Sequence, residues 1–279
     1  MSSNLILSVI IPTYHRNDLL AQCLDCLDPG IQTLAWENYE VIVTDDGYET
    51  TAEVMIQEKY SWVQWVIGPK KGPAANRNNG AKYAQGKWLV FTDDDCLPDR
   101  TWLSNFLKAI VPEIRVYEGK TICQSIISSP LEYAPVNLTG GYLWSCNMMI
   151  HADVFSQLEG FDENFPYAHL EDVDLRERLK LKNYIFQFVE GAIVEHPSRK
   201  QQWGASLGKT HESFLYLKSK LKEPISKSSF LYYILSYRIK SLLQFSPSWE
   251  LLKAIFLMIE ELLYVLQKMN QWYKKYPLV

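Results

Sequence analysis

Residues 7–13 have the sequence Leu-Ser-Val-Ile-Ile-Pro-Thr, a short apolar, β-branched run that ends at a proline and a threonine. Such a run predicts a buried β-strand that is followed by a loop. Helical spacing follows at 19–27, and the same alternation then continues along the chain. Further strands are expected at 39–44, 62–67 and 87–92, and further helices at 50–60, where Thr residues could cap the start, and at 74–84. Strands that alternate with helices at this pitch predict an α/β fold with a mainly parallel sheet between helices.

The pattern changes after residue 100. Strand-like pieces are expected at 120–128 and 141–150, and residues 153–183 are expected to be helical. From residue 206 onward the chain has mostly helical patterns, which Pro224 and Pro247 interrupt. We therefore expect an α/β body over residues 1–200 and a helical C-terminal appendage over residues 201–279.

Composition and charge limit the function classes. The 279 residues are 47% hydrophobic and 22% charged, which is typical of a globular chain. The net charge of −4 combines −12 over residues 1–197 with +8 over residues 198–279. Nucleic acid is not expected as a partner, because phosphate contacts need clustered Lys and Arg, which the acidic body lacks.

The cysteines and the first residues indicate the compartment. Five scattered cysteines in a chain of this length favour a reducing compartment, so a cytoplasmic location is expected. Cys23 and Cys26 lie in a predicted helix without a second pair at zinc spacing, and we interpret them as ordinary helix residues. Residues 1–8 have no basic segment, and no stretch approaches the roughly 20 apolar residues of a spanning helix.

Carboxylates follow two of the predicted strands. Asp93, Asp94 and Asp95 end the strand at 87–92, and Asp45-Asp46-Gly47 ends the strand at 39–44. Each group alone is also typical of a solvated turn. Ligands of parallel sheets bind at the carboxyl ends of the strands, however, and clustered carboxylates need a compensating cation. Hard oxygen ligands suit Mg²⁺ or Mn²⁺, so the sequence predicts a metal and diphosphate site there.

Three further polar groups carry both a structural and a functional interpretation. Arg77, near a helix start, could bind a diphosphate or belong to a polar helix end. Glu171 and Asp172 could complement a helix dipole or supply a general base. His196, after an apolar strand-like piece, could be a core histidine or a third metal ligand.

Taken in order, the motifs of residues 7–197 resemble those of family 2 glycosyltransferases, which are inverting enzymes of the GT-A fold. The motifs are Pro12-Thr13-Tyr14, Asp45-Asp46-Gly47, Arg77-Asn78-Asn79-Gly80, Asp93-Asp94-Asp95, Gly160-Phe161-Asp162 and Glu171-Asp172. The resemblance implies a GT-A nucleotide-diphospho-sugar transferase fold, with a nucleotide-binding half at 1–100 and an acceptor and catalytic half at 101–200. Tyr48 stands where a serine is common in the family, which leaves the nucleotide open.

The resemblance also implies a role for each matching residue. The nucleotide pocket would be lined by Pro12, Thr13, Tyr14, Asp45, Asp46, Arg77, Asp93 and Asp94. Asp95 would be the direct Mn²⁺ or Mg²⁺ ligand of the DXD motif, and His196 matches a histidine that in some members joins the metal or diphosphate. Asp172 would be the catalytic base, and Asn147 and Glu171 would lie near the donor sugar and acceptor.

These residues imply a metal-dependent transfer of a sugar from a nucleotide diphosphate, UDP being expected. The acceptor would be a hydroxyl of a saccharide or lipid-linked saccharide in surface polysaccharide or glycan assembly. One alternative is a catalytically inactive sugar- or lipid-binding GT-A protein, in which Asp95 and Asp172 would be dispensable. Another is a sugar nucleotidylyltransferase, although such enzymes typically have a Gly-rich loop with Arg and Lys after the first strand. Here that loop is Pro-Thr-Tyr-His-Arg.

The C-terminal stretch at 249–273 predicts a long amphipathic helix. Its apolar stripe consists of Leu252, Ile255, Phe256, Ile259, Leu263, Leu266 and Met269. This stripe could pack on the body, join an oligomer, or dock on a membrane. The positive charge after residue 197 and the nearby Tyr and Trp residues favour peripheral contact with the cytosolic face of a membrane.

Overall fold

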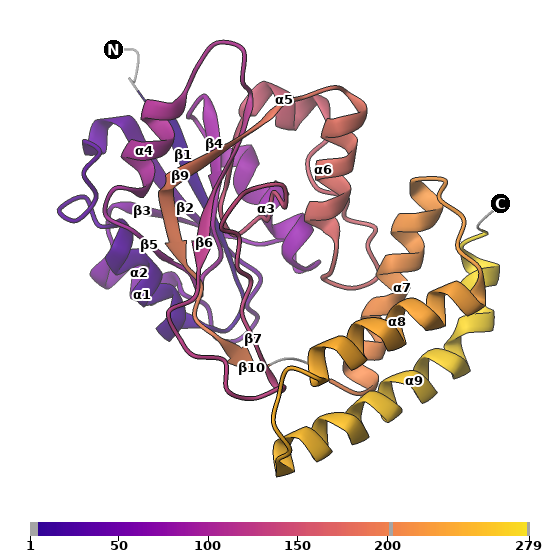
Figure 1. Ribbon diagram of the computed structural model, residues 1–279. Coiled ribbons are helices and arrows are strands. Elements are labelled where there is room, and N and C mark those ends of the chain that lie inside the picture. The colour runs from indigo at the N-terminus through magenta and orange to yellow at the C-terminus, as the bar shows by residue number, and fades with distance from the viewer. Residues whose placement is uncertain (1–4, 201–202, 278–279) are drawn as a thin grey trace. The chain divides into compact units, whose positions relative to one another are not determined.

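The computed structural model describes residues 5–200 and 203–277, in two compact units (Figure 1). The sheet unit comprises Met1–Gln124, Pro135–Glu163 and Glu171–Pro197, and the helical unit comprises Ser125–Ala134, Asn164–Leu170 and Ser198–Val279. Residues 1–4, which belong to the stretch without a basic segment, lie outside the described residues.

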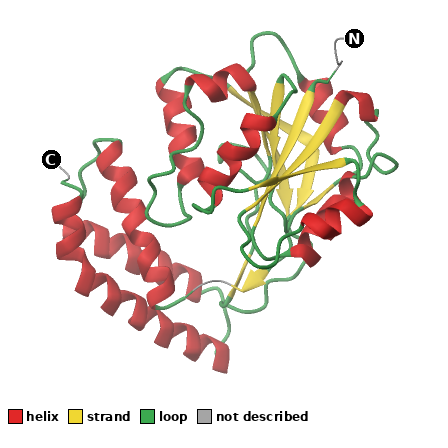
Figure 2. Ribbon diagram, turned by 180° about the vertical axis from the view of Figure 1, so that it is seen from behind, coloured by secondary structure: helices red, strands yellow, loops and turns green. Residues whose placement is uncertain are grey.

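The sheet unit is built on a mixed sheet, whose strands are yellow in Figure 2. The strand order is β3-β2-β1-β4-β8-β6-β9-β5. The strands are β1 (Leu7–Thr13), β2 (Tyr39–Asp45), β3 (Val63–Ile67), β4 (Trp88–Phe91), β5 (Leu97–Pro98), β6 (Val116–Ile122), β8 (Met148–His151) and β9 (Phe186–Glu195). β1 to β4 pair in parallel, as the sequence predicts, while β8 runs antiparallel to both β4 and β6. The fold is therefore the expected α/β class with a mainly parallel sheet.

Helices cover both faces of this sheet. They are α1 (Asn17–Leu27), α2 (Glu53–Lys59), α3 (Pro73–Tyr83), α4 (Trp102–Ala109), α5 (Ala152–Gln157) and α6 (Glu171–Leu181), with a short 3₁₀ helix η1 (Trp36–Asn38). Successive residues of a strand point to opposite faces, so Val9 and Ile11 join one core cluster and Ile10 joins the other. α1, α2 and α4 contribute to the first cluster, and α3, α5 and α6 contribute to the second.

One glycine explains how closely α3 approaches the sheet. A Cβ atom at Gly80 would lie 2.6 Å from Cγ2 of Ile10 on β1, closer than side-chain atoms tolerate. This close approach sets α3, and with it Arg77, beside the carboxyl ends of β1 and β2.

Several local expectations are wrong. Ala52 stands at the start of α2 without a side-chain cap, so the expected threonine cap is absent there, and the carboxylate of Asp45 accepts a hydrogen bond from the Ala52 N–H instead. Only parts of 120–128 and 141–150 form strands, and the positive φ values of Gly141 (98°) and Leu143 (50°) are incompatible with a strand at the start of the second stretch. The expected helix at 153–183 is two helices, α5 and α6, separated by a loop.

The helical unit contains the expected C-terminal helices. These are α7 (Ala205–Lys220), α8 (Lys227–Leu242) and α9 (Trp249–Lys275), with a two-stranded sheet of β7 (Glu132–Tyr133) and β10 (Arg199–Lys200). Ser226 and Ser248 cap α8 and α9 by accepting hydrogen bonds from the backbone N–H groups of Ser229 and Leu251. No helix in the described part of the chain combines the length and apolar character needed to cross a bilayer.

A buried ionic group lies inside the helical unit. Glu261 on α9 is fully buried and accepts hydrogen bonds from Arg238 on α8, with Nε to Oε2 at 2.9 Å. Nε2 of His211 on α7 lies 2.6 Å from Oε1 of the same carboxylate. Glu261 therefore links all three helices, because a buried charge needs such partners.

Candidate active site

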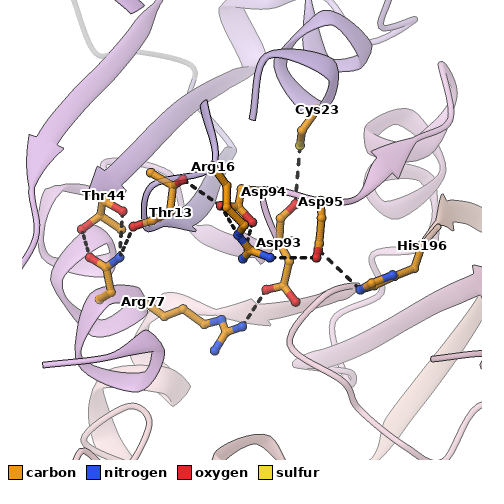
Figure 3. Close-up of polar contacts among 10 residues, drawn as sticks. Thr13, Arg16, Cys23, Thr44, Arg77, Asp93, Asp94, Asp95 and His196 are labelled. Atoms are coloured by element: carbon orange, nitrogen blue, oxygen red, sulfur yellow. Dashed lines mark hydrogen bonds and ion pairs between the residues drawn. The ribbon is translucent and has the colours of Figure 1, made fainter. Parts of the chain in front are cut away.

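The carboxyl ends of three neighbouring strands bring most of the predicted residues to one edge of the sheet. Figure 3 shows Thr13 and Asp93 to Asp95 among them. Thr13, the last residue of β1, lies in register with Asp45, the last residue of β2. The backbone N–H of Asp46 donates to the carbonyl of Thr13 at 3.0 Å. Asp93 to Asp95 follow β4, which is the other neighbour of β1. The strand order therefore places the two acidic motifs on either side of Pro12-Thr13-Tyr14.

The two carboxylates after β2 organise the loops around them. Asp45 accepts hydrogen bonds from the N–H groups of Gly47 at 2.8 Å and Ala52 at 2.6 Å. Asp46 accepts from the N–H groups of Lys70 at 2.9 Å and Gly72 at 3.0 Å, and its burial raises the pKa of Asp46. Both carboxylates shape this edge of the sheet.

Arg16 compensates the charge of the carboxylates after β4. Asp94 is fully buried and accepts a hydrogen bond from the hydroxyl of Thr13 at 2.7 Å. Arg16 contacts Asp94 through Nη2 at 2.5 Å and Asp95 through Nη1 at 2.9 Å. Burial raises the pKa of Asp94 to about 7, although Arg16 opposes the shift. Arg16 is absent from the predicted site residues. Its position in the sequence could have indicated it, because Arg16 ends the segment that begins at Pro12.

Arg77 connects this edge to the start of α6. Its buried guanidinium contacts Asp93 through Nη2 at 2.6 Å and Glu171 through Nη1 at 3.3 Å. Burial disfavours the charged guanidinium, but the two carboxylates more than offset this and raise the pKa of Arg77. The same guanidinium lies over the ring of Phe161, 5.7 Å from its centre. Glu171 is thus a partner of Arg77 within the site.

Asp172 lies next to this pair, in the first turn of α6. Burial, with the neighbouring charge of Glu171, raises the pKa of Asp172 to about 6, while Arg77 acts in the opposite direction. A carboxylate with such a pKa is mostly ionised at neutral pH and still basic enough to accept a proton. These properties suit the predicted general base.

Two other predicted residues have different surroundings. Tyr14 is 52% exposed beside the strand ends. Asn147 is buried, donates hydrogen bonds to the carbonyls of Lys120 at 3.0 Å and Ala192 at 3.1 Å, and accepts one from the indole N–H of Trp102 at 2.9 Å. Asn147 therefore joins β6, β9 and α4, and its role near the donor sugar stays a prediction.

Asp95 offers a carboxylate oxygen, the donor that hard divalent cations prefer, and His196 offers an imidazole nitrogen beside it. Nε2 of His196 lies 3.4 Å from Oδ1 of Asp95 and makes no hydrogen bond among the described residues. Nδ1 of His196 lies 3.0 Å from the carbonyl oxygen of Pro197, so a neutral ring that donates to this oxygen has its lone pair on Nε2. Cys96 offers a sulfur in the same group, but burial raises the pKa of its thiol well above the usual range. Because the thiol of Cys96 stays protonated, Asp95 and His196 are the candidate ligands, and the carboxylate of Asp95 suits Mn²⁺ or Mg²⁺.

Comparisons with known proteins agree with this architecture. The family model described as glycosyl transferase family 2 matches residues 8–118. A GalNAc(5)-diNAcBac-PP-undecaprenol beta-1,3-glucosyltransferase of Campylobacter jejuni is 34% identical over 94 residues, which are 32% of this chain and 29% of that protein. The chain spans about half or less of the length of the curated relatives that it matches first.

Solved structures show the same fold. The TarS fragment 1–349 of S. aureus in complex with UDP has a TM-score of 0.57 and 19% identity, over 81% of this chain and 69% of that one. The mannosyltransferase PcManGT of Pyrobaculum calidifontis in complex with GDP-Man and Mn²⁺ has a TM-score of 0.58 and 14% identity, over 95% of this chain and 75% of that one. With the family match and the order of the strand-end motifs, these likenesses confirm the GT-A fold. Over residues 8–118 the chain matches glycosyl transferase family 2, the family that its motifs resemble.

Proposed function

We propose that this protein is a metal-dependent, inverting glycosyltransferase. It transfers a sugar from a nucleotide-diphosphate sugar, with UDP as the expected nucleotide, to a hydroxyl of a saccharide or lipid-linked saccharide in surface polysaccharide or glycan assembly. One observation carries the proposal: Arg77 contacts both Asp93, at the strand ends, and Glu171, the neighbour of Asp172. A donor site and a general base are thereby joined in one unit.

The donor side is assigned to the edge formed by β1, β2 and β4. Thr13 and Tyr14 follow the central strand, and Asp45 and Asp46 border it on one side. Asp93 and Asp94 border it on the other side, so a nucleotide bound across the edge would meet all three loops. The UDP and GDP-Man complexes of the structural neighbours support this assignment of a nucleotide sugar.

The divalent cation would be held by Asp95 and His196, and when bound it would offset the negative charge that develops on the diphosphate leaving group. Arg16, which contacts Asp94 and Asp95, compensates these carboxylates within the protein itself. The Mn²⁺ in the mannosyltransferase structure supports a divalent ion for this fold.

Asp172 supplies the base. Its carboxylate removes the proton from the acceptor hydroxyl, whose oxygen then attacks the anomeric carbon while the bond to the diphosphate oxygen breaks. Attack from the face opposite the diphosphate inverts the anomeric configuration. The proton ends on Asp172 and the electron pair of the broken bond on the nucleoside diphosphate. Arg77 keeps the pKa of Asp172 from rising further and so favours the basic form.

Slow donor hydrolysis tests this function. Purified protein incubated with a panel of nucleotide sugars and Mn²⁺ should release a nucleoside diphosphate from one of them, and Asp95→Ala should abolish the release. An inactive sugar-binding protein would bind without hydrolysis, and a nucleotidylyltransferase would form nucleoside triphosphate from the donor and pyrophosphate. Either result would contradict the proposal.

We also propose that the protein acts at the cytosolic face of a membrane, through α9. The exposed apolar residues of α9 are Trp249, Leu252, Ile255, Phe256, Ile259, Leu263 and Leu266. Lys253 is exposed on the same helix, and the chain after residue 197 carries a charge of +8. An apolar helix face in a basic segment suits the interface of an anionic leaflet, where a lipid-linked acceptor would be found. The undecaprenol-linked substrate in the name of the Campylobacter relative supports such an acceptor.

A further inference from the structure

The loop around residues 137–144 is held in place beside α6. Glu118 on β6 is buried and accepts hydrogen bonds from three consecutive backbone N–H groups of this loop. The contacts are to Gly141 at 2.5 Å, Tyr142 at 3.1 Å and Leu143 at 2.9 Å. The amide of Asn137 donates to the same carboxylate at 3.0 Å.

The backbone of this loop adopts a conformation that needs such support. Gly141 has a φ of 98°, and Leu143 has a φ of 50°, which a side chain disfavours. Leu143 is nevertheless fully buried in the second core cluster. The carboxylate of Glu118 and this buried side chain together hold the strained backbone in place.

Two carbonyl groups of the loop accept hydrogen bonds from α6. Nη1 of Arg176 donates to the carbonyls of Gly141 at 3.3 Å and Tyr142 at 3.2 Å. Arg176 lies four residues after Asp172 on α6, so both residues belong to the same face of that helix, about 6 Å apart along its axis. The loop is therefore fixed to the helix that carries the general base.

This rigid loop presents an aromatic pair. The rings of Tyr142 and Trp144 lie 4.7 Å apart between centres, at an interplanar angle of 38°. Trp144 packs partly against the first core cluster, whereas Tyr142 is 44% exposed. The backbone of Tyr142 is hydrogen-bonded through both its N–H and its carbonyl group, so the exposed ring is not needed to stabilise the loop.

We propose that Tyr142, supported by Trp144, binds a pyranose ring of the acceptor, which stacks its C–H face on the aromatic surface of this loop, fixed by Arg176 to the helix that carries Asp172. A pyranose has an apolar C–H face and a hydroxyl rim, and the electron-rich face of an aromatic ring attracts such C–H groups. Because the loop is already ordered, binding costs little conformational entropy. The role of this saccharide as the acceptor rests on the proposed function. Binding of a saccharide to Tyr142 can be measured without a donor.

Saturation-transfer difference NMR on the full chain tests the inference. The probes are methyl β-glucoside, methyl β-galactoside and methyl β-N-acetylglucosaminide, titrated without nucleotide and then with UDP and Mn²⁺. Wild-type protein should saturate the ring C–H protons of at least one probe. Tyr142→Ala should weaken its binding by about 3- to 10-fold, the contribution of one aromatic contact, and Tyr142→Phe should retain it. The matched control is Tyr83→Ala, because Tyr83 is 43% exposed and lies at the end of α3, outside the loop.

Equal binding by wild type and Tyr142→Ala would overturn the inference, and so would the absence of saturation for every probe. Equal loss in Tyr83→Ala would also overturn it, because the effect would then not be specific to the loop. The proposed function fails by a separate measurement, the absence of nucleotide-sugar hydrolysis by the wild-type protein. That result would leave saccharide binding that depends on Tyr142 in place.

Discussion

Replacement of Arg77 by Met should destabilise the sheet unit in a manner that depends on pH. The side chain of Arg77 is 6% exposed and compensates Asp93 at 2.6 Å and Glu171 at 3.3 Å. Met fills much of the same space without the charge, so both carboxylates would lose their cation. Removing one partner of a buried ion pair costs about 3–5 kcal/mol, and the partial exposure of the two carboxylates favours the lower end, about 3 kcal/mol.

A loss of about 3 kcal/mol corresponds to a fall of roughly 6–12 °C in the unfolding temperature of a domain of this size. Calorimetry in EDTA measures this fall in unfolding temperature. A separate scan with UDP and Mn²⁺ and without EDTA identifies the sheet unit, because its unfolding temperature is the one that these ligands increase. The penalty should be full at pH 8 and should shrink towards pH 5, because Arg77 opposes the rise in the pKa of Asp172, and without Arg77 the folded state takes up a proton there more readily than the unfolded state does.

The matched control is Lys180→Met on α6. Lys180 contacts Glu177 at 3.0 Å, but its side chain is 48% exposed. Exposed pairs contribute about 0–1 kcal/mol, so this variant should lower the unfolding temperature by at most roughly 2–4 °C. If Arg77→Met costs no more than Lys180→Met, or if its cost is the same at pH 5 and pH 8, Arg77 does not compensate the two carboxylates as argued.

Further predictions concern the reaction and the membrane. Asp172→Asn should lower kcat by at least about 100-fold with UDP affinity nearly unchanged, and lost UDP binding in calorimetry would count against this role. In the wild type, activity should rise through about pH 6 as Asp172 loses its proton, and a flat profile from pH 5 to 7 would exclude Asp172 as the titrating base. Asp95→Ala should remove Mn²⁺ binding measured by calorimetry while changing stability by only about 1 kcal/mol, and unchanged Mn²⁺ affinity would refute its role as ligand. Phe256→Glu should lower co-sedimentation with phosphatidylglycerol-containing vesicles by about tenfold at low salt, whereas Leu181→Glu on α6 should not, and equal binding by both variants would argue against docking through α9.

The sequence by itself determined the elements of the fold and the strand-end motifs. Alternation and helical spacing are properties of neighbouring residues, so β1 to β4 and the helices between them could be predicted from the residues that they contain. Because the carboxyl ends of parallel strands meet at one edge, the convergence of Asp45 and Asp93 near Thr13 followed from the same pattern.

Only the tertiary structure decided which charges pair. Arg16 meets Asp94 across 78 residues, and Arg77 meets Glu171 across 94, contacts that depend on strand order and helix packing rather than on local spacing. The hydrogen bonds that Glu118 accepts from the N–H groups of residues 141–143 also depend on how separate elements pack. No periodicity marks such partners, because each arises where separate elements are packed together.

The sequence of α9 does not determine which face of the helix is buried. Its sequence predicts an apolar stripe, but apolar residues also occupy the opposite side of the helix. In the folded chain Ala254, Val265 and Trp272 are buried with Glu261, while Phe256 and Leu263 of the predicted stripe are 68% and 55% exposed. The spacing of apolar residues gives a helix and its faces. Which face finds a partner depends on the shape and charge of the neighbouring helices, here Arg238 on α8 and His211 on α7, which contact Glu261 and so turn its face inward.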